Sequence, residues 1–167
     1  MTETSSGRAR LIGAVAGGLV AGLGISVLLI AGERRDGEPS ELVALEREGA
    51  RRLGLATPDD AVLPSAGEQA VVQAGHLALS AAAGAIYAAT VDEDTPALPG
   101  GIGFGIAFYA GAHWIVGPLL GLKPPEWRAD PGTIAMHTIN HLAFGIVTAV
   151  AANLAAGAAS PTQGVSA

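Results

Sequence analysis

Four histidines are the residues of this chain best suited to chemistry, and all lie inside or at the edge of long apolar segments. They are His76, His113, His137 and His141. An ionisable side chain within a membrane is costly in lipid and usually faces the interior of a helix bundle or a water-filled cavity. His137 and His141 are spaced so that a helix would present both on one face. These residues therefore predict a histidine cluster inside a membrane protein.

A cluster of this kind fits three functions and one structural role. His76, His113 and His141 are candidates for proton sensing or relay, because imidazole titrates near neutral pH. His137 and His141 are candidate metal ligands, with His113 or His76 completing the set. Two histidines on facing helices can also ligate haem. The commonest role of polar residues in membranes is structural, and on that interpretation the imidazoles only hydrogen-bond between helices.

Other classes of function lack the residues that they need. The chain has no cysteine, which excludes disulfides, thiolate metal sites and cysteine nucleophiles. No carboxylate lies within the apolar segments, and Ser80 has no acidic residue near it in the sequence, so no nucleophile is paired with a base. The net charge of −6 argues against a nucleic-acid surface, which needs clustered lysine and arginine. We therefore expect a non-enzymatic protein.

The elements that must position the histidines are four long segments without a charged residue. The 9 basic and 15 acidic residues all lie in blocks outside these segments. The segments are Leu11–Gly32, Gln69–Val91, Thr95–Leu122 and Pro131–Ala167. Each is longer than the roughly 20 residues that a helix needs to cross a bilayer. A soluble bundle would instead carry charges on one face of each helix.

The sequence thus predicts an all-α fold, a single integral membrane domain over residues 1–167 with four transmembrane helices in the lipid bilayer. These helices are expected at about 11–31, 70–91, 100–121 and 134–156. The first is too long for a usual signal peptide and is interpreted as an uncleaved anchor. Its small residues form two packing faces, and the partner is either another helix of the chain or a second copy in a homo-oligomer. The faces are Gly13 with Gly17, and Gly18 with Gly22.

The polar segment 33–68 is predicted to be an inter-helix loop with a helix of its own near 40–55, capped by Ser40. This helix has a narrow apolar stripe. The arginines that flank the stripe are Arg47, Arg51 and Arg52. The helix either lies on the membrane surface with its arginines toward lipid headgroups or is an ordinary solvated helix. The tail 158–167 is predicted to be disordered.

Positive charges on the two sides of the membrane predict the orientation. With four spans, both termini and the short acidic turn 92–99 share one side, which carries only Arg8 and Arg10. The side richer in lysine and arginine is normally cytoplasmic, so both termini are expected outside. The basic residues of the richer side are Arg34, Arg35, Arg47, Arg51, Arg52, Lys123 and Arg128. The short turn also predicts that the second and third helices are antiparallel neighbours.

The same topology places the histidines on one side of the membrane. At about 1.5 Å per residue, His76 and His141 lie roughly 9 to 10 Å from the starts of their helices, and His113 lies about 12 Å from the end of its own. A kink is expected at Pro118, one turn beyond His113, because proline lacks an amide proton. A stiff connector follows, with Pro124 and Pro125. We expect a small polar cavity among the last three helices.

Five short motifs between Ala74 and Ala156 form a pattern. They are Gly75-His76, Ala85-Ile86-Tyr87, Gly101-x-x-x-Gly105, His113 followed by Pro118-Leu119-x-Gly121-Leu122-x-Pro124-Pro125, and His141-Leu142-x-Phe144-Gly145. This pattern resembles the YagU-like family of small bacterial inner-membrane proteins. The resemblance implies a polytopic inner-membrane protein with no established reaction and a suggested link to acid tolerance. The family often carries an acidic residue one turn before its last histidine, where this chain has His137.

Overall fold

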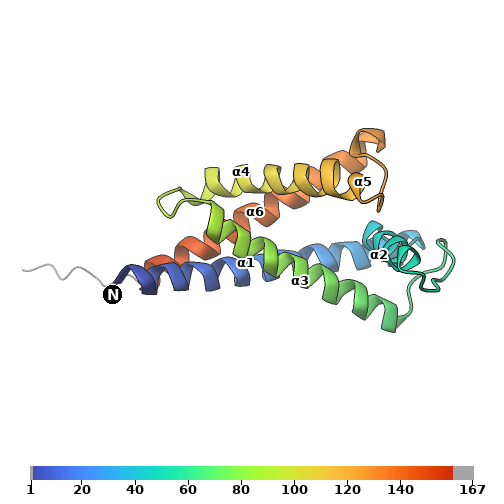
Figure 1. Ribbon diagram of the computed structural model, residues 1–167, viewed down its shortest axis with the longest axis horizontal. Coiled ribbons are helices and arrows are strands. Elements are labelled where there is room, and N and C mark those ends of the chain that lie inside the picture. The colour runs from blue at the N-terminus through green and yellow to red at the C-terminus, as the bar shows by residue number, and fades with distance from the viewer. Residues whose placement is uncertain (1, 160–167) are drawn as a thin grey trace, which may run out of the picture.

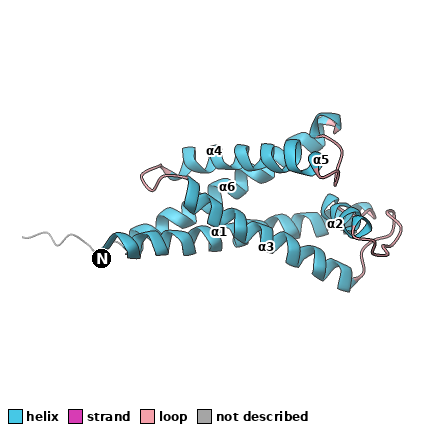
Figure 2. Cartoon of the chain, viewed as in Figure 1, coloured by secondary structure: helices cyan, strands magenta, loops and turns pink. Residues whose placement is uncertain are grey.

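A computed structural model describes residues 2–159, and the regular structure in that range is entirely helical (Figure 2). Its elements are α1 (Thr2–Asp36), α2 (Glu41–Arg52), α3 (Ala66–Thr90), α4 (Ala97–Tyr109), the π-helix η1 (Ala110–Val116), α5 (Gly117–Leu119), the 3₁₀ turn η2 (Glu126–Arg128) and α6 (Pro131–Ala159). The stretches long and apolar enough to cross a membrane are Ser5–Asp36, Ala66–Thr90, Ala97–Leu119 and Pro131–Ala159. The predicted all-α fold with four membrane-spanning helices is confirmed, and the architecture is that of a multi-pass membrane protein.

The helices differ from their predicted bounds mainly by reaching past the apolar segments. α1 is the clearest case, because it runs to Asp36 rather than ending near residue 31. Charged residues at helix ends lie at the level of the headgroups, so an uncharged run marks only the hydrocarbon part of a helix. α6 continues to Ala159, so the first two residues of the predicted disordered tail are helical. The rest of that tail, 160–167, lies outside the described residues.

Successive membrane helices run in opposite directions, so the bundle has two distinct ends (Figure 1). The start of α1, the turn between α3 and α4 and the end of α6 lie at one end, the terminal end. α2 with its loop and the connector 120–130 lie at the other, the loop end. α6 packs against α1 and α4, and α3 packs mainly against α1. α3 and α4 meet only near their turn, where the rings of Tyr87 and Phe104 lie 5.3 Å apart, and then diverge.

Glycines explain why α4 follows α6 instead of α3. A Cβ atom at Gly105 of α4 would lie 2.4 Å from the carbonyl oxygen of His141. A Cβ atom at Gly145 of α6 would lie 2.2 Å from the carbonyl oxygen of Gly101. Small residues allow backbones to approach this closely, which is how helices associate when lipid is the solvent.

The two glycine faces of α1 have partners within the same chain. Gly13 and Gly17 face α6, where a Cβ atom would meet Ala151 at 2.5 and 2.7 Å. Gly18 and Gly22 face Ser80 of α3, again at 2.5 Å or less. Of the two partners left open by the sequence, the structure shows the internal one. Association of whole chains stays a prediction and would need a different surface.

α2 forms where the sequence predicts a loop helix, but its central arginine points inward. Arg47 is completely buried and donates to Glu68 at 2.7 Å and to the carbonyl oxygen of Val62 at 2.9 Å. The expectation that Arg47 faces lipid headgroups or solvent is therefore wrong. Its guanidinium binds the returning loop to the start of α3, since several carbonyls and one carboxylate converge on it. These partners keep the pKa of Arg47 above its ordinary value, the Glu68 hydrogen bond being the main cause.

We expect Gly145→Ala to destabilise the protein by about 1–3 kcal/mol, because its methyl group would overlap the α4 backbone and overpacking costs that much in other cores. Gly103→Ala is the matched control, since no atom lies within 4 Å of a Cβ there. It should be neutral or stabilising by roughly 0.5–1 kcal/mol, because alanine favours a helix. Reversible unfolding in detergent micelles would measure both. Equal stability of the two variants would contradict the contact.

Candidate functional site

A π-helix precedes the proline where a kink is predicted. Pro118 has no amide proton to give to the carbonyl of Trp114, and the backbone from Ala110 to Val116 forms a π-helix directly before α5. An extra residue in a turn re-aims side chains, and such segments are frequent at functional sites. His113 lies inside this segment. The expected backbone irregularity beside His113 is thus found.

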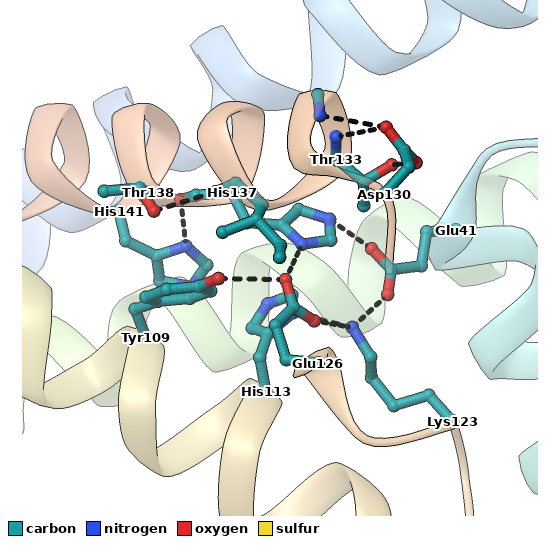
Figure 3. A network of polar contacts seen from close by, with 12 residues as sticks. Glu41, Tyr109, His113, Lys123, Glu126, Asp130, Thr133, His137, Thr138 and His141 are labelled. Atoms are coloured by element: carbon teal, nitrogen blue, oxygen red, sulfur yellow. Dashed lines mark hydrogen bonds and ion pairs between the residues drawn. The ribbon is translucent and has the colours of Figure 1, made fainter. Parts of the chain in front are cut away.

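Side chains from five parts of the chain meet at the loop end and form what we call the charge cluster (Figure 3). Its members are Glu41 of α2, Tyr109 of α4, His113 of η1, Lys123 and Glu126 of the connector, and His137 and His141 of α6. The connector brings its two members back over the bundle because Gly121, with a φ of 66°, reverses the chain after α5. The cluster therefore joins the membrane helices to the two segments that cover them.

His137 is held between two carboxylates. Its Nδ1 lies 2.6 Å from Oε1 of Glu126, and its Nε2 lies 2.5 Å from Oε2 of Glu41. The side chains of His137 and Glu126 are almost completely buried, whereas that of Glu41 is partly exposed. An ionised carboxylate can only accept hydrogen bonds, so both ring nitrogens must carry a proton to make these contacts. With both carboxylates ionised, the geometry therefore calls for an imidazolium ion at His137.

Lys123 completes the charge balance. Its ammonium group donates to Glu41, to Oε2 of Glu126 at 2.9 Å, and to Nδ1 of His113 at 2.8 Å. An ammonium has three protons to donate, and all three are used. Because Nδ1 of His113 accepts, the proton of this neutral ring lies on Nε2. Two carboxylates, one ammonium and one imidazolium sum to zero net charge.

Neutral groups surround the four charges. The hydroxyl of Tyr109 donates to Oε1 of Glu126 at 2.9 Å, and Nδ1 of His141 donates to the carbonyl oxygen of His137 at 2.8 Å. The ring centroid of His113 lies 4.3 Å from that of His137 and 4.9 Å from that of His141. These contacts fix the orientation of the three imidazoles.

Both glutamates of the cluster keep their charge to a lower pH than an ordinary glutamate. Burial opposes the charge of Glu126, but hydrogen bonds from His137, Lys123 and Tyr109 outweigh it and lower the pKa of this carboxyl to about 2. Burial likewise opposes the charge of Glu41, and hydrogen bonds from His137 and Lys123 lower its pKa to about 2. The carboxylate half of the cluster therefore persists over the whole physiological range.

The structure brings three of the four predicted histidines together and separates the fourth. His113, His137 and His141 share one site, as their predicted depths suggested. His76 lies elsewhere, with Nδ1 3.0 Å from Oγ of Ser26 in α1. The cavity expected among the last three helices therefore does not include α3, because α3 packs on α1 and diverges from α4.

Sequence reasoning missed the charged half of the site. Glu41, Lys123 and Glu126 lie in polar blocks, which count as solvated loops when each block is considered alone. Nothing in the sequence marks Tyr109 as a member of the site except its position one turn before His113. The Pro-Pro pair that follows Lys123 was the available signal in the sequence. It makes the connector stiff, and a stiff connector can hold the charge of Lys123 over the end of a membrane helix.

Metal and haem fit this arrangement differently. Ligand atoms of Glu41, His113 and His137 all lie within 4.8 Å of one another, a spacing that a metal ion can bridge. The ammonium of Lys123 already binds Glu41 and His113, so a metal would have to displace it. For haem, the packing of His113 against His137 and His141 leaves no space for a porphyrin between the rings.

A pocket of about 170 Å³ opens beside the cluster. It is lined by Glu41, Lys123, Pro124, Pro125, Glu126, Arg128, Ala129 and Thr133. Water and protons can therefore reach the charged groups from the loop end without crossing the bundle.

No family model, curated protein or solved structure matches this chain. The function must therefore be argued from the site itself.

We expect the stability contributed by the cluster carboxylates to be lost in acid. A carboxyl with a depressed folded-state pKa stabilises fully above its unfolded value of 4.5 and loses this contribution as the pH falls toward 2. In detergent, the thermal midpoint should therefore decline below about pH 4.5. The double substitution Glu41→Gln and Glu126→Gln should lower the midpoint at neutral pH and flatten that decline. An equally steep decline in the double variant would mean that other groups cause it.

Proposed function

We propose that this chain is a non-enzymatic multi-pass membrane protein that responds to pH through the charge cluster. The observation that carries the proposal is the position of the His137 ring, whose two nitrogens lie 2.5 and 2.6 Å from two different carboxylates. Histidine is the side chain whose charge ordinarily changes between about pH 5 and 8. Here that change decides whether the cluster is neutral.

Loss of one proton from His137 would disrupt the cluster locally. The ring would keep one donor, so one carboxylate would face an acceptor nitrogen, and the cluster would carry a net charge of −1. All charged or titratable groups in contact with the ring belong to the cluster described above. None of these groups can donate a hydrogen bond in place of the lost His137 proton without breaking a hydrogen bond that it already makes. The bond to the more exposed partner, Glu41, is the one expected to open.

Opening this bond would leave Lys123 as the remaining charged partner of Glu41 and would weaken the attachment of α2 to α6. Glu41 is the first residue of α2, and its two partners lie on α6 and on the connector. Arg47 would keep the far part of the helix attached to Glu68. The expected change is therefore a local loosening of the start of α2, which a protein or lipid at that membrane surface can sense.

The structure favours this function over the metal-binding alternative. A metal would have to displace Lys123, an ammonium with all three of its hydrogen bonds made. It would also have to remove the protons through which His137 binds its carboxylates. Elemental analysis of the purified protein distinguishes the two, because stoichiometric metal lost on His113→Ala would support the alternative.

Hydrogen exchange of backbone amides measures the proposed loosening. As the pH rises through the range of about 5 to 8 in which histidine ordinarily titrates, protection of the α2 amides, corrected for the intrinsic rate, should fall because His137 loses its second proton. His137→Gln should show low protection at all of these pH values. His76→Gln is the matched control, since His76 contacts Ser26 and not the cluster, and it should keep the wild-type profile. Identical profiles for wild type and His137→Gln would overturn the proposal.

We further propose that the membrane is the bacterial inner membrane and that both termini lie outside the cytoplasm. Supporting this are the excess of basic residues at the loop end and the pattern that resembles YagU-like proteins, including His113 and the run Pro118–Pro125. Membership of that family, and the acid tolerance suggested for it, would accord with a cluster that titrates. The cluster would then face the cytoplasm and report its pH.

Fusion reporters test the orientation. A C-terminal alkaline phosphatase, which is active only outside the cytoplasm, should be active, and a C-terminal fluorescent protein that matures only inside should be dark. The same reporters placed in the loop between α2 and α3 should give the opposite pair of results. A fluorescent C-terminal fusion with an inactive phosphatase would reverse the orientation.

A further inference from the structure

The pocket beside the charge cluster lies at the level of the lipid headgroups. It adjoins the ends of two membrane-spanning stretches, because one ends at Leu119, and Thr133, a pocket residue, belongs to the first turn of the other. Trp127 lies between two pocket residues in the sequence and is 60% exposed, and its ring centroid lies 6.0 Å from that of Trp114. Exposed tryptophans are typical of the level where lipid meets water. The pocket is therefore within reach of the polar ends of lipids.

The size of the pocket suits part of a ligand better than a whole one. Its volume of about 170 Å³ is below the range of roughly 300–1,000 Å³ that is usual for sites enclosing a small molecule. It can hold the polar end of a molecule whose remainder stays outside. A phospholipid is such a molecule, since its acyl chains stay in the hydrocarbon. Leu119, which is 81% exposed just before the connector, offers those chains an apolar surface.

Most polar groups that line the pocket are already used by the protein. The ammonium of Lys123 donates all three of its hydrogen bonds, and both oxygens of Glu126 accept hydrogen bonds. The hydroxyl of Thr133 donates to Asp130 at 2.6 Å, and the carboxylate of Asp130 also accepts from backbone amides at the start of α6. A ligand must therefore be recognised by other groups of the pocket.

Two pocket groups of opposite charge keep free binding capacity. Arg128 is exposed, and its guanidinium makes no hydrogen bond or ion pair with the residues that the structure describes. A guanidinium presents its donors in a planar fork that fits a phosphate. The side chain of Glu41 is 37% exposed, and each of its oxygens binds one partner and can accept a second. The pocket thus offers one position for a phosphate and one for an ammonium.

One kind of headgroup matches both of these groups. An anionic headgroup would bring another negative charge close to Glu41 and give that carboxylate no new partner. A choline headgroup carries both charges, but its quaternary nitrogen has no proton to donate. Phosphoethanolamine carries a phosphate and, joined to it by a short carbon chain, a primary ammonium with three protons to donate. It therefore pairs Arg128 and Glu41 with opposite charges and leaves the charge balance of the cluster unchanged.

We propose that this pocket binds the headgroup of a phosphatidylethanolamine molecule, with the phosphate on Arg128 and the ammonium on Glu41. The bound lipid joins the connector to the start of α2, because these two residues belong to those two segments. The site goes beyond the proposed function, since binding by Arg128 and Glu41 does not require His137 to titrate.

Native mass spectrometry of the full chain in detergent tests the site. The probes are phosphatidylethanolamine, phosphatidylcholine and phosphatidylglycerol with the same acyl chains, added at equal concentrations. One phosphatidylethanolamine should bind about tenfold more tightly than either of the others, because each of those loses one hydrogen bond between charged groups. Equal binding of the three lipids would overturn the proposal. Tighter binding of phosphatidylglycerol would also overturn it, since the pocket would then take an anion alone.

Arg128→Gln should weaken the binding of phosphatidylethanolamine about tenfold, because the phosphate loses its charged donor. Arg34→Gln is the matched control. Arg34 is likewise exposed near the loop end and has no partner among the described residues, but it does not line the pocket. It should bind the lipid as the wild type does. Equal binding by the two variants would contradict the phosphate position.

A second arm tests the ammonium position. In Glu41→Gln the preference for phosphatidylethanolamine over phosphatidylcholine should disappear, because the amide has no negative charge to attract the ammonium. A preference that persists in folded Glu41→Gln would contradict that contact. Arg128 is exposed and unpaired, so Arg128→Gln keeps the proposal testable if Glu41→Gln does not fold. The hydrogen-exchange profile of His137→Gln tests the pH response separately, so failure of one proposal does not imply failure of the other.

Discussion

Where lipid surrounds this chain, each charge must be neutralised by another part of the chain, and the loop end is arranged around that requirement. His137 and Lys123 supply two positive charges, and Glu41 and Glu126 supply two negative ones. Removing one partner from a buried pair is strongly destabilising, because the other charge is left without compensation. The cluster therefore attaches both α2 and the connector to the bundle. It is also the point at which the bundle is most sensitive to a change of charge.

The glycine contacts and the cluster occupy successive levels of the same helix pair. Near the terminal end, α4 and α6 touch backbone to backbone at Gly101 and Gly145. Further along, Tyr109, His113 and His137 stand between them, so the helices must separate. The π-helical segment lies at this level, where a regular helix would not present His113 to its partners. Tight packing at one end thus leaves the volume for polar groups at the other.

The membrane architecture could be predicted from the sequence because it depends on the length and the missing charges of whole segments. Charge-free runs long enough to span lipid have few alternatives, so the four helices were foreseen, as was the position of His113, His137 and His141 toward one end of the bundle. The site could not be predicted in full, because it depends on which polar residues return to the bundle from the loops. Nothing local distinguishes Glu41 from Glu46, or Arg47 from Arg51, until the fold pairs Glu41 with His137 and buries Arg47. His76 was misplaced for a related reason: the charge-free runs do not determine which helix α3 packs against.

The charge balance also limits which residues can occupy position 137. An acidic residue at position 137 would replace the imidazolium with a third carboxylate beside Glu41 and Glu126, and the cluster would change from neutral to a net charge of −2. Like charges at hydrogen-bond distance cannot all stay ionised, so at least one carboxyl would have to take up a proton. A chain with an acid there needs either a protonated carboxyl or different residues at positions 41 and 126. His137 and its two glutamates are therefore best regarded as one unit, whose members make physical sense only together.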